Sequence, residues 1–366
     1  MKITMKYGTR AFKMASLLAA LLTTTSMAIE INKDASIADT STTIMGINHI
    51  GLSVKDLDAS LAFYQQSTQF KVIRREKVSN SAEADRLFGR ADISYEIAVL
   101  KAPNMVFELM SFEHNQQLAN SVMPAKGPGI THTCFQSPAD HSGWDKFIAA
   151  GATPLSRGGE PIDLLGQGVT YGYAYDPEGN MIELEQLEPK ILKRAGYTNM
   201  NQNAGAKMWM SQVAVATHDI ERLMEFYQQV LGFQPYRSAD ISDRVTFDQI
   251  VDIDNLHLKA AWFKMNQGSK VIELWQFINP LTPQFLGQRT ATDFGYSFSL
   301  EVGDINQEYR RLKALGVDFF SAPEMVSGSW QAYARDIDGN IFSLRQMVNA
   351  DSVLSVKVLD QPIPSS

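Results

Sequence analysis

Four side chains on four separate apolar segments carry the chemistry that a divalent metal ion needs. They are two imidazoles and two carboxylates, His49, Glu108, His132 and Glu183. A carboxylate within an apolar strand is costly to bury unless it is paired or bound to a metal. Imidazole nitrogen and carboxylate oxygen together suit zinc, nickel, cobalt, manganese or iron(II). We therefore predict one divalent ion held by these four residues, with a position left open for a substrate.

The expected strands place these residues on one side of a sheet. Side chains alternate between faces along a strand, so His49 faces away from Ile50 and Leu52, and Glu183 faces away from Ile182. The strand at 181–185 follows a turn sequence, Asp-Pro-Glu-Gly-Asn, at 176–180. Taken singly, a histidine in a strand is usually a hydrogen-bonded core residue and a glutamate is usually solvated. Four such residues, one on each strand and all opposite the helix-packing face, favour a metal site.

The chain repeats itself at two levels. The segment at 56–66 returns at 219–229, each opening with an aspartate suited to cap a helix. Asp176–Asn180 likewise returns at 336–340, and a weaker repeat divides each half into two. Each unit is too small to cover its own sheet. We predict an α+β fold of four βαβββ modules, paired two per half into two open barrels with helices outside.

The N-terminal residues of the chain indicate export. Residues 1–28 have a basic start, a short apolar run and small residues at Ser26-Met27-Ala28, which is typical of a signal peptide cleaved before Ile29. An uncleaved membrane anchor is the alternative.

The further boundaries we expect are a loose segment at 29–43, a first domain with the metal site at 44–188, a linker at 189–207, a second domain at 208–346 and a tail at 347–366, in which 353–359 is a short strand.

The net charge and the cysteine count limit the classes of binding partner and cross-link that we expect. Residues 1–28 hold four basic and no acidic side chains, so cleavage changes the formal net charge from −7 to −11. A chain this acidic, without a basic stripe, is a poor candidate for nucleic acid or anionic membranes. Its single cysteine, Cys134, excludes an intrachain disulfide; we expect it to be a small buried apolar residue. We predict a periplasmic or secreted protein that stays off the membrane after signal cleavage, and an oligomer is compatible with the sequence.

The motifs resemble the vicinal oxygen chelate superfamily, which includes glyoxalase I, bleomycin resistance proteins and ring-cleaving dioxygenases. The resemblance covers most of residues 44–346. It depends on the strand that opens with His49, the Phe107-Glu108-Leu109 and Gly129-Ile-Thr-His132 segments, and the run from Asp176 to Glu183. It implies a small-molecule substrate bound to the metal through two adjacent oxygens. It does not select one reaction, because a fold hosts many chemistries.

Three functions follow from the resemblance. Glyoxalase-like members bind metal with His or Gln, Glu, His and Glu, and one glutamate moves a proton through an enediolate; this implies an isomerase or lyase with Glu183 as base and Glu108 as the alternative. Epimerase-like members usually carry Gln at the position of Glu108. Extradiol dioxygenases hold iron(II) with two His and one Glu, normally in the second half. A non-catalytic binding or resistance protein is the third.

The second half departs from the ligand pattern. In register with the four predicted ligands stand Gln212, Glu273, Ser297 and Ser343, with Tyr296 in third place if the register shifts by one. Two serines cannot replace an imidazole and a carboxylate. We expect Glu273 to pair with Arg345, and the second domain to hold a vestigial site that stabilises the first, or else a metal-free pocket. Whether barrels pair within one chain or between chains is open.

Overall fold

The structure is a computed structural model that describes residues 30–31, 42–113, 122–195, 206–265, 270–349 and 351–360. The expected signal peptide at 1–28 and most of the expected loose segment at 29–43 lie outside the described residues. Within them, no helix is both long enough and apolar enough to cross a bilayer.

The repeated aspartates cap matching helices. Helix α2 (Leu57–Thr68) begins after Asp56, whose side chain accepts a hydrogen bond from the backbone N–H of Ala59. Helix α6 (Ile220–Leu231) begins after Asp219, which accepts from Arg222 in the same way. Each satisfies a backbone donor that the first helical turn leaves unpaired. The helices begin where the repeat predicts.

Four modules follow one another, each with an opening strand, a helix and further strands. The first comprises β2 (Ile44–Ser53), α2, β3 (Lys71–Val78), α3 (Ala82–Phe88), β4 (Tyr95–Lys101) and β5 (Val106–Phe112). The second comprises β6 (Gly129–Pro138), α4 (Ser142–Ala149), β7 (Thr153–Pro154), the 3-10 turn η1 (Arg157–Gly159), β8 (Ile162–Asp163), β9 (Val169–Tyr175) and β10 (Met181–Leu187).

The second half repeats this order. The third module comprises β11 (Trp209–Ala216), α6, β12 (Arg237–Ile241), α7 (Val245–Val251), β13 (His257–Lys264) and β14 (Val271–Asn279). The fourth comprises β15 (Gly295–Val302), α8 (Ile305–Ala314), β16 (Asp318–Phe319), β17 (Glu324–Val326), β18 (Ser329–Arg335) and β19 (Ile341–Met347). Short elements lie outside the modules: β1 (Glu30–Ile31), α5 (Pro189–Arg194) in the expected linker and α9 (Val356–Leu359) in the tail.

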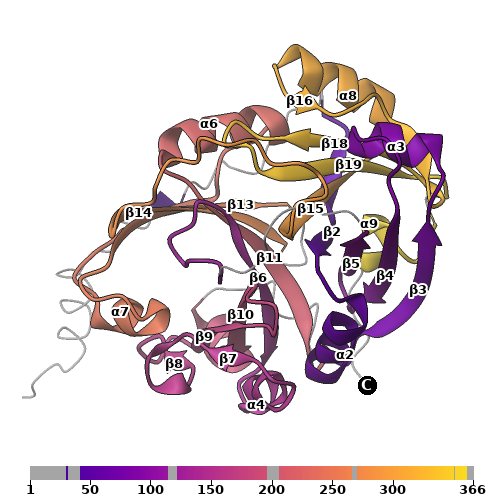
Figure 1. The fold of residues 1–366 in the computed structure, drawn as a ribbon. Helices are drawn as coiled ribbons and strands as arrows, with labels where there is room; N and C mark the ends of the chain where they lie inside the picture. The colour runs from indigo at the N-terminus through magenta and orange to yellow at the C-terminus, as the bar shows by residue number, and fades with distance from the viewer. Residues whose placement is uncertain are drawn as a thin grey trace, which may run out of the picture.

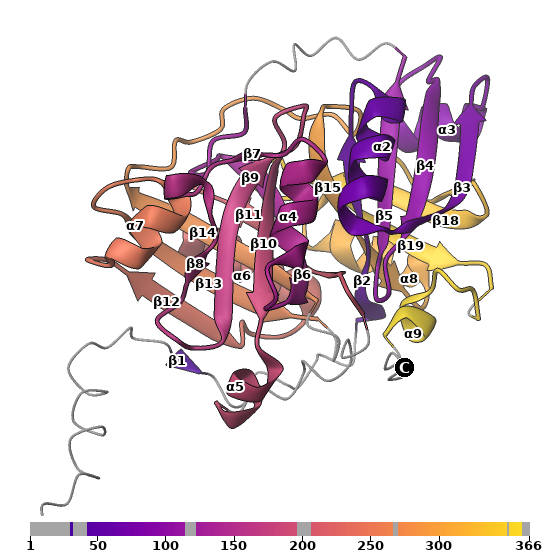
Figure 2. The same cartoon turned by 90° about the horizontal axis from the view of Figure 1, so that it is seen from below.

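The modules do not pair within each half of the chain, as expected, but across the two halves. The second and third modules form one sheet, in which β6 pairs antiparallel with β11; we call it the middle sheet. The first and fourth modules form the other, in which β2 pairs antiparallel with β15; we call it the terminal sheet. In Figure 2 the two sheets lie side by side. Each sheet therefore draws on both halves of this one chain.

The strand order determines which side chains meet. In the described residues the middle sheet runs β1-β12-β13-β14-β11-β6-β10-β9-β7, with β8 on β9. The terminal sheet runs β16-β18-β19-β15-β2-β5-β4-β3, with β17 on β18. The helices lie outside the curled sheets, as Figure 1 shows for α2 and α4 below and α6 and α8 above. The predicted fold class, with four modules in two open barrels, is confirmed.

Contacts between helices join the two sheets. Helix α2 belongs to the terminal sheet and α4 to the middle sheet, and Phe63 and Phe147 bring them together with ring centroids 6.0 Å apart. Beside them, the buried Tyr64 hydroxyl donates to Asp176 Oδ2 over 2.9 Å. The apolar core is continuous across both sheets.

The tail differs from the expected strand at 353–359. Ser355 caps the short helix α9 and donates to Glu301 Oε1 over 2.6 Å. The backbone N–H of Val356 donates to the other oxygen of Glu301 over 2.7 Å. This carboxylate accepts hydrogen bonds from donors at the start of a helix that have no partner within the helix, which holds the segment in helical form.

Candidate metal centre

The four predicted ligands do not come together. His132 and Glu183 lie in the middle sheet on β6 and β10, whereas His49 and Glu108 lie in the terminal sheet on β2 and β5. The physical reason is the pairing of modules, because β2 of the first module pairs with β15 and not with β6. Each pair of predicted ligands meets residues of the second half.

In the middle sheet, His132 and Glu183 meet Gln212 and Glu273. We call these four residues the middle cluster. They stand on four neighbouring strands, in the order β14, β11, β6 and β10. Cys134 pairs in register with both Gln212 and Glu183, and Ala214 pairs with both Glu273 and His132. Adjacent strands lie about 4.8 Å apart, so four inward side chains in this register converge.

The distances in the middle cluster suit a metal ion. Ligand atoms of His132, Glu183 and Glu273 all lie within 4.8 Å of one another, and all three residues are buried. His132 Nε2 lies 3.4 Å from Glu183 Oε2 and 3.7 Å from Glu273 Oε2. It is buried and, in the described part of the chain, has no hydrogen-bond partner. A buried imidazole nitrogen without a hydrogen-bond partner, placed between two carboxylates, is positioned to bind a metal ion.

Gln212 completes the set. Its Nε2 donates to Glu183 Oε2 over 2.8 Å and to Glu273 Oε2 over 2.9 Å. Rotating the amide by half a turn exchanges its nitrogen for its oxygen. The carbonyl oxygen would then face the point where the carboxylates converge. One imidazole, one amide oxygen and two carboxylates neutralise a divalent ion.

The tautomer of His132 is set by Thr131. The Thr131 hydroxyl lies 3.0 Å from His132 Nδ1 and 3.5 Å from the carbonyl oxygen of Ala214. If the hydroxyl donates to that carbonyl, it accepts from Nδ1–H, which leaves the lone pair on Nε2. Histidine ligands commonly donate their second N–H in this way.

The electrostatics of the middle cluster favour a cation. Burial lowers the pKa of His132, but the adjacent carboxylates of Glu183 and Glu273 outweigh it and raise the pKa to about 9. Two buried carboxylates therefore retain a proton on the imidazole when no other cation is present. Among the described residues, neither carboxylate has a lysine or arginine nitrogen within 4.0 Å. The residues fit a divalent ion.

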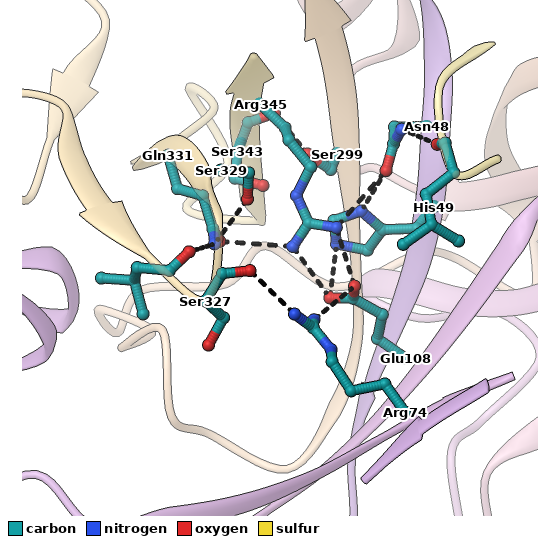
Figure 3. Close-up of polar contacts among 12 residues, drawn as sticks. Asn48, His49, Arg74, Glu108, Ser299, Ser327, Ser329, Gln331, Ser343 and Arg345 are labelled. Carbon is teal, nitrogen blue, oxygen red and sulfur yellow. Dashed lines mark hydrogen bonds and ion pairs between the residues drawn. The ribbon is translucent and has the colours of Figure 1, made fainter. Parts of the chain in front are cut away.

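The terminal sheet holds a different group, which we call the terminal cluster: His49, Glu108 and Arg345. Arg345 donates to Glu108 Oε1 over 2.7 Å and to Oε2 over 3.1 Å, as Figure 3 shows. His49 Nε2 lies 3.3 Å from Glu108 Oε2. The expected pair of Arg345 with Glu273 is therefore replaced by a pair with Glu108. In this position a guanidinium stands where a metal ion would have to be.

The pKa values of the terminal cluster agree with an ion pair. Burial raises the pKa of Glu108, but the charge and hydrogen bonds of Arg345, with the charge of Arg74, outweigh it and lower the pKa to about 2. Burial and the Arg345 charge lower the pKa of His49 to about 3, so its imidazole is neutral. Both oxygens of Glu108 are occupied by the arginine. The terminal cluster does not fit a divalent ion.

The serines expected in the second half lie in the terminal sheet. Ser343 and Ser299 pair across β19 and β15, and Ser299 pairs with His49. By the same register, Ser297 stands where the middle sheet has His132, and Ser343 where it has Glu183. The predicted equivalence of these positions is thus correct. The degenerate site, however, is shared by both halves.

Two ligand candidates, Gln212 and Glu273, were assigned by sequence to a vestigial site. The sequence contained a signal for both residues. Each faces inward, and together they supply the Gln and the Glu that complete a ligand set with His132 and Glu183. Sequence alone did not show that β11 adjoins β6 and thereby brings β14 next to it in the same sheet. Cys134 is buried, as expected, and burial raises the pKa of its thiol.

Comparison with known proteins agrees with the modules. Residues 46–184 and 211–333 each match a sequence profile of the glyoxalase/bleomycin resistance protein/dioxygenase superfamily. An ethylmalonyl-CoA/methylmalonyl-CoA epimerase of Cereibacter sphaeroides is 25% identical over 142 residues, which cover 38% of this chain and 97% of the epimerase.

Two solved structures share the fold over most of this chain. Glyoxalase I from Zea mays superposes with a TM-score of 0.53 at 18% identity, covering 82% of this chain and 92% of its own. A putative dioxygenase from Bacillus subtilis superposes with a TM-score of 0.54 at 12% identity, covering 89% and 93%.

Proposed function

Because the chain belongs to the glyoxalase/bleomycin resistance protein/dioxygenase superfamily, we propose that it is a metal-dependent isomerase or lyase whose site is the middle cluster. His132, Glu183, Gln212 and Glu273 would hold one divalent ion, namely zinc, nickel, cobalt, manganese or iron(II). The observation that carries the proposal is a buried imidazole between two buried carboxylates without a basic partner. We also propose that the chain is exported after cleavage before Ile29.

The bound ion would polarise two adjacent oxygens of a small substrate and so make a neighbouring C–H group more acidic. The two carboxylates differ in their readiness to take that proton. Glu273 Oε1 accepts a hydrogen bond from Trp262 Nε1, and its Oε2 accepts from Gln212. Glu183 accepts from Gln212 at Oε2 only, among the described residues. The less restrained Glu183 is the better general base and, after proton transfer, the better acid.

The composition of the middle cluster separates this function from its rivals. The dioxygenase alternative needs two histidines and one glutamate, and the middle cluster supplies one histidine and two glutamates. Glu108, the alternative base, is engaged by Arg345 in the other sheet. A binding protein without turnover would have no use for a general base at Glu183. The isomerase or lyase reaction therefore has the best support.

The test is the metal content of the chain from residue 29 onward, measured by elemental mass spectrometry after loading. We expect about one equivalent in the native protein, its loss in His132→Ala and in Glu273→Ala, and its retention in His49→Ala. The last variant is the matched control, since His49 holds in the terminal sheet the position of Gln212. Loss of metal in His49→Ala with retention in His132→Ala would refute the assignment.

Turnover distinguishes an enzyme from a binding protein. Glu183→Gln keeps a neutral oxygen ligand but removes the base. In a screen of 2-oxoaldehydes and epimerisable 2-oxo compounds, the native protein should react and this variant should retain metal without reacting. An active Glu183→Gln would exclude Glu183 as the base.

A further inference from the structure

Arg237 is a cation on the concave face of the middle sheet that has no carboxylate partner among the side chains that the structure describes. It is the first residue of β12 and pairs in register with Trp262 on β13. Its guanidinium carbon lies 3.7 Å from the Trp262 ring centroid, which is a cation–π contact. Among the side chains of residues 42–113, 122–195, 206–265, 270–349 and 351–360, no carboxylate oxygen lies within 4.0 Å of its guanidinium nitrogens. Its Nε atom is buried and makes no hydrogen bond to the described residues.

Trp262 connects Arg237 to the candidate metal centre. The indole stacks beneath the guanidinium and donates its N–H to Glu273 Oε1. Only one side chain therefore separates the arginine from a proposed ligand. The same concave face holds Tyr173 and Trp275, whose polar atoms are buried and unpaired among the described residues. Two unpaired donors thus lie on the face that holds the middle cluster.

The terminal sheet has an arginine, Arg74, at the equivalent position, and it provides a comparison for Arg237. Arg74 pairs with Val99, which pairs with Glu108. Arg237 pairs with Trp262, which pairs with Glu273, so the two arginines are equivalent.

The two arginines differ in their partners. Arg74 Nη2 lies 4.0 Å from Glu108 Oε1, and its Nη1 lies 3.7 Å from Glu76 Oε1. Protein carboxylates thus balance the charge of Arg74. At the position of Val99 the middle sheet has an indole, which stands between Arg237 and the carboxylate of Glu273.

We propose that Arg237 binds a carboxylate of the substrate, so that the substrate of the middle cluster carries this group as well as two adjacent oxygens. The proposal rests on the proposed metal-dependent function. A carboxylate accepts two parallel hydrogen bonds from the Nε and Nη of an arginine, and the buried Nε of Arg237 is free for one of them. Glu183, Glu273 and the nearby Glu185 already place negative charge at this site. A substrate group with one negative charge therefore suits it better than a group with two.

Two chelators that differ by one carboxylate test this proposal. Acetohydroxamate offers two adjacent oxygens, and succinate monohydroxamate adds a carboxylate. Charge-assisted hydrogen bonds contribute about 1.5–3 kcal/mol, which corresponds to about a 10- to 150-fold change in affinity. By calorimetry, the metal-loaded native protein should bind succinate monohydroxamate at least about 10-fold more tightly. Malonate and glutarate monohydroxamates extend the series to shorter and longer reach.

The variants assign the preference to one residue. Arg237→Gln should remove it and leave acetohydroxamate affinity unchanged, Arg237→Lys should retain part of it, and Arg74→Gln, the matched control, should retain all of it. An unchanged preference in Arg237→Gln, or its equal loss in Arg74→Gln, would overturn the proposal. Failure of both chelators to bind would overturn it too. Metal content of the same samples shows whether the metal centre itself has failed. Thermal melting checks that each variant is folded.

Discussion

Replacing Arg345 by methionine should destabilise the protein by about 3 kcal/mol at pH 7. The carboxyl of Glu108 has its pKa lowered on folding from an ordinary 4.5 to about 2, which corresponds to about 3 kcal/mol. Breaking a buried ion pair from one side costs about 3–5 kcal/mol, because the other charge stays buried and unpaired. The side chains of Arg345 and Glu108 are only 4% and 1% exposed, so water screens the pair little.

The deficit should depend on pH in a defined direction. The folded pKa of Glu108 lies below its unfolded value, so the pair contributes its full stability above pH 4.5 and loses it as the pH falls toward 2. In Arg345→Met, burial remains and raises the pKa of Glu108, so the carboxyl takes up a proton more readily. The difference between native and variant should therefore be largest at pH 7 and shrink by pH 3.

Urea unfolding followed by circular dichroism at pH 7, 5 and 3 measures this difference. The control is Arg157→Met, which removes an exposed pair with Asp252 whose side chains are 41% and 49% exposed; it should cost less than about 1 kcal/mol. The double variant Glu108→Gln with Arg345→Met removes both charges and should recover much of the loss. A deficit below about 1 kcal/mol, or one that does not change with pH, would refute the reasoning.

Three further predictions concern other parts of the chain. Nickel, cobalt or zinc at about 100 times the dissociation constant should stabilise the native protein by about 2.7 kcal/mol and raise its melting temperature in calorimetry; an equal rise in His132→Ala would place the metal elsewhere. Tyr227→Phe removes a hydroxyl that donates to buried Asp336 over 2.9 Å, so urea unfolding should show a loss of about 1–3 kcal/mol, and no loss would show that the bond contributes nothing. Expression in a bacterium with a periplasm should give a mature protein whose N-terminal sequence begins at Ile29; a chain recovered from the membrane with residues 1–28 attached would contradict the proposed cleavage.

Local features of the fold could be predicted because their causes are local. The aspartates at 56 and 219 cap helices through their own first turns. The inward phase of His49, Glu108, His132 and Glu183 follows from the two-residue period of strands. The equivalence of Gln212 with His49 follows from the repeat. Each of these depends on a few neighbouring residues and was correct.

The grouping of the ligands could not be predicted in the same way. Pairing the first module with the second or with the fourth buries the same apolar faces, so the hydrophobic pattern does not choose between them. The choice is made by contacts such as β2 with β15, which are distant in sequence. Arg345 faces inward, and a guanidinium beside Glu108 is incompatible with a cation there. The inward phase of Arg345 was predicted from the sequence, but its position beside Glu108 depends on the pairing of β2 with β15 and so could not be predicted.

The nesting of the modules has a consequence for the time course of folding. The strands of the middle sheet that carry the candidate ligands lie within a continuous stretch from β6 to β14, and they can pair as soon as that stretch is made. Strand β2, with eight buried positions, must wait for β15. Roughly 250 residues separate them, which is on the order of tens of seconds of synthesis at about 5–20 residues per second. During that interval β2 can pair with β5 of its own module, but its other edge has no partner and is available to a chaperone. An exported chain would cross the membrane before its first and last modules meet.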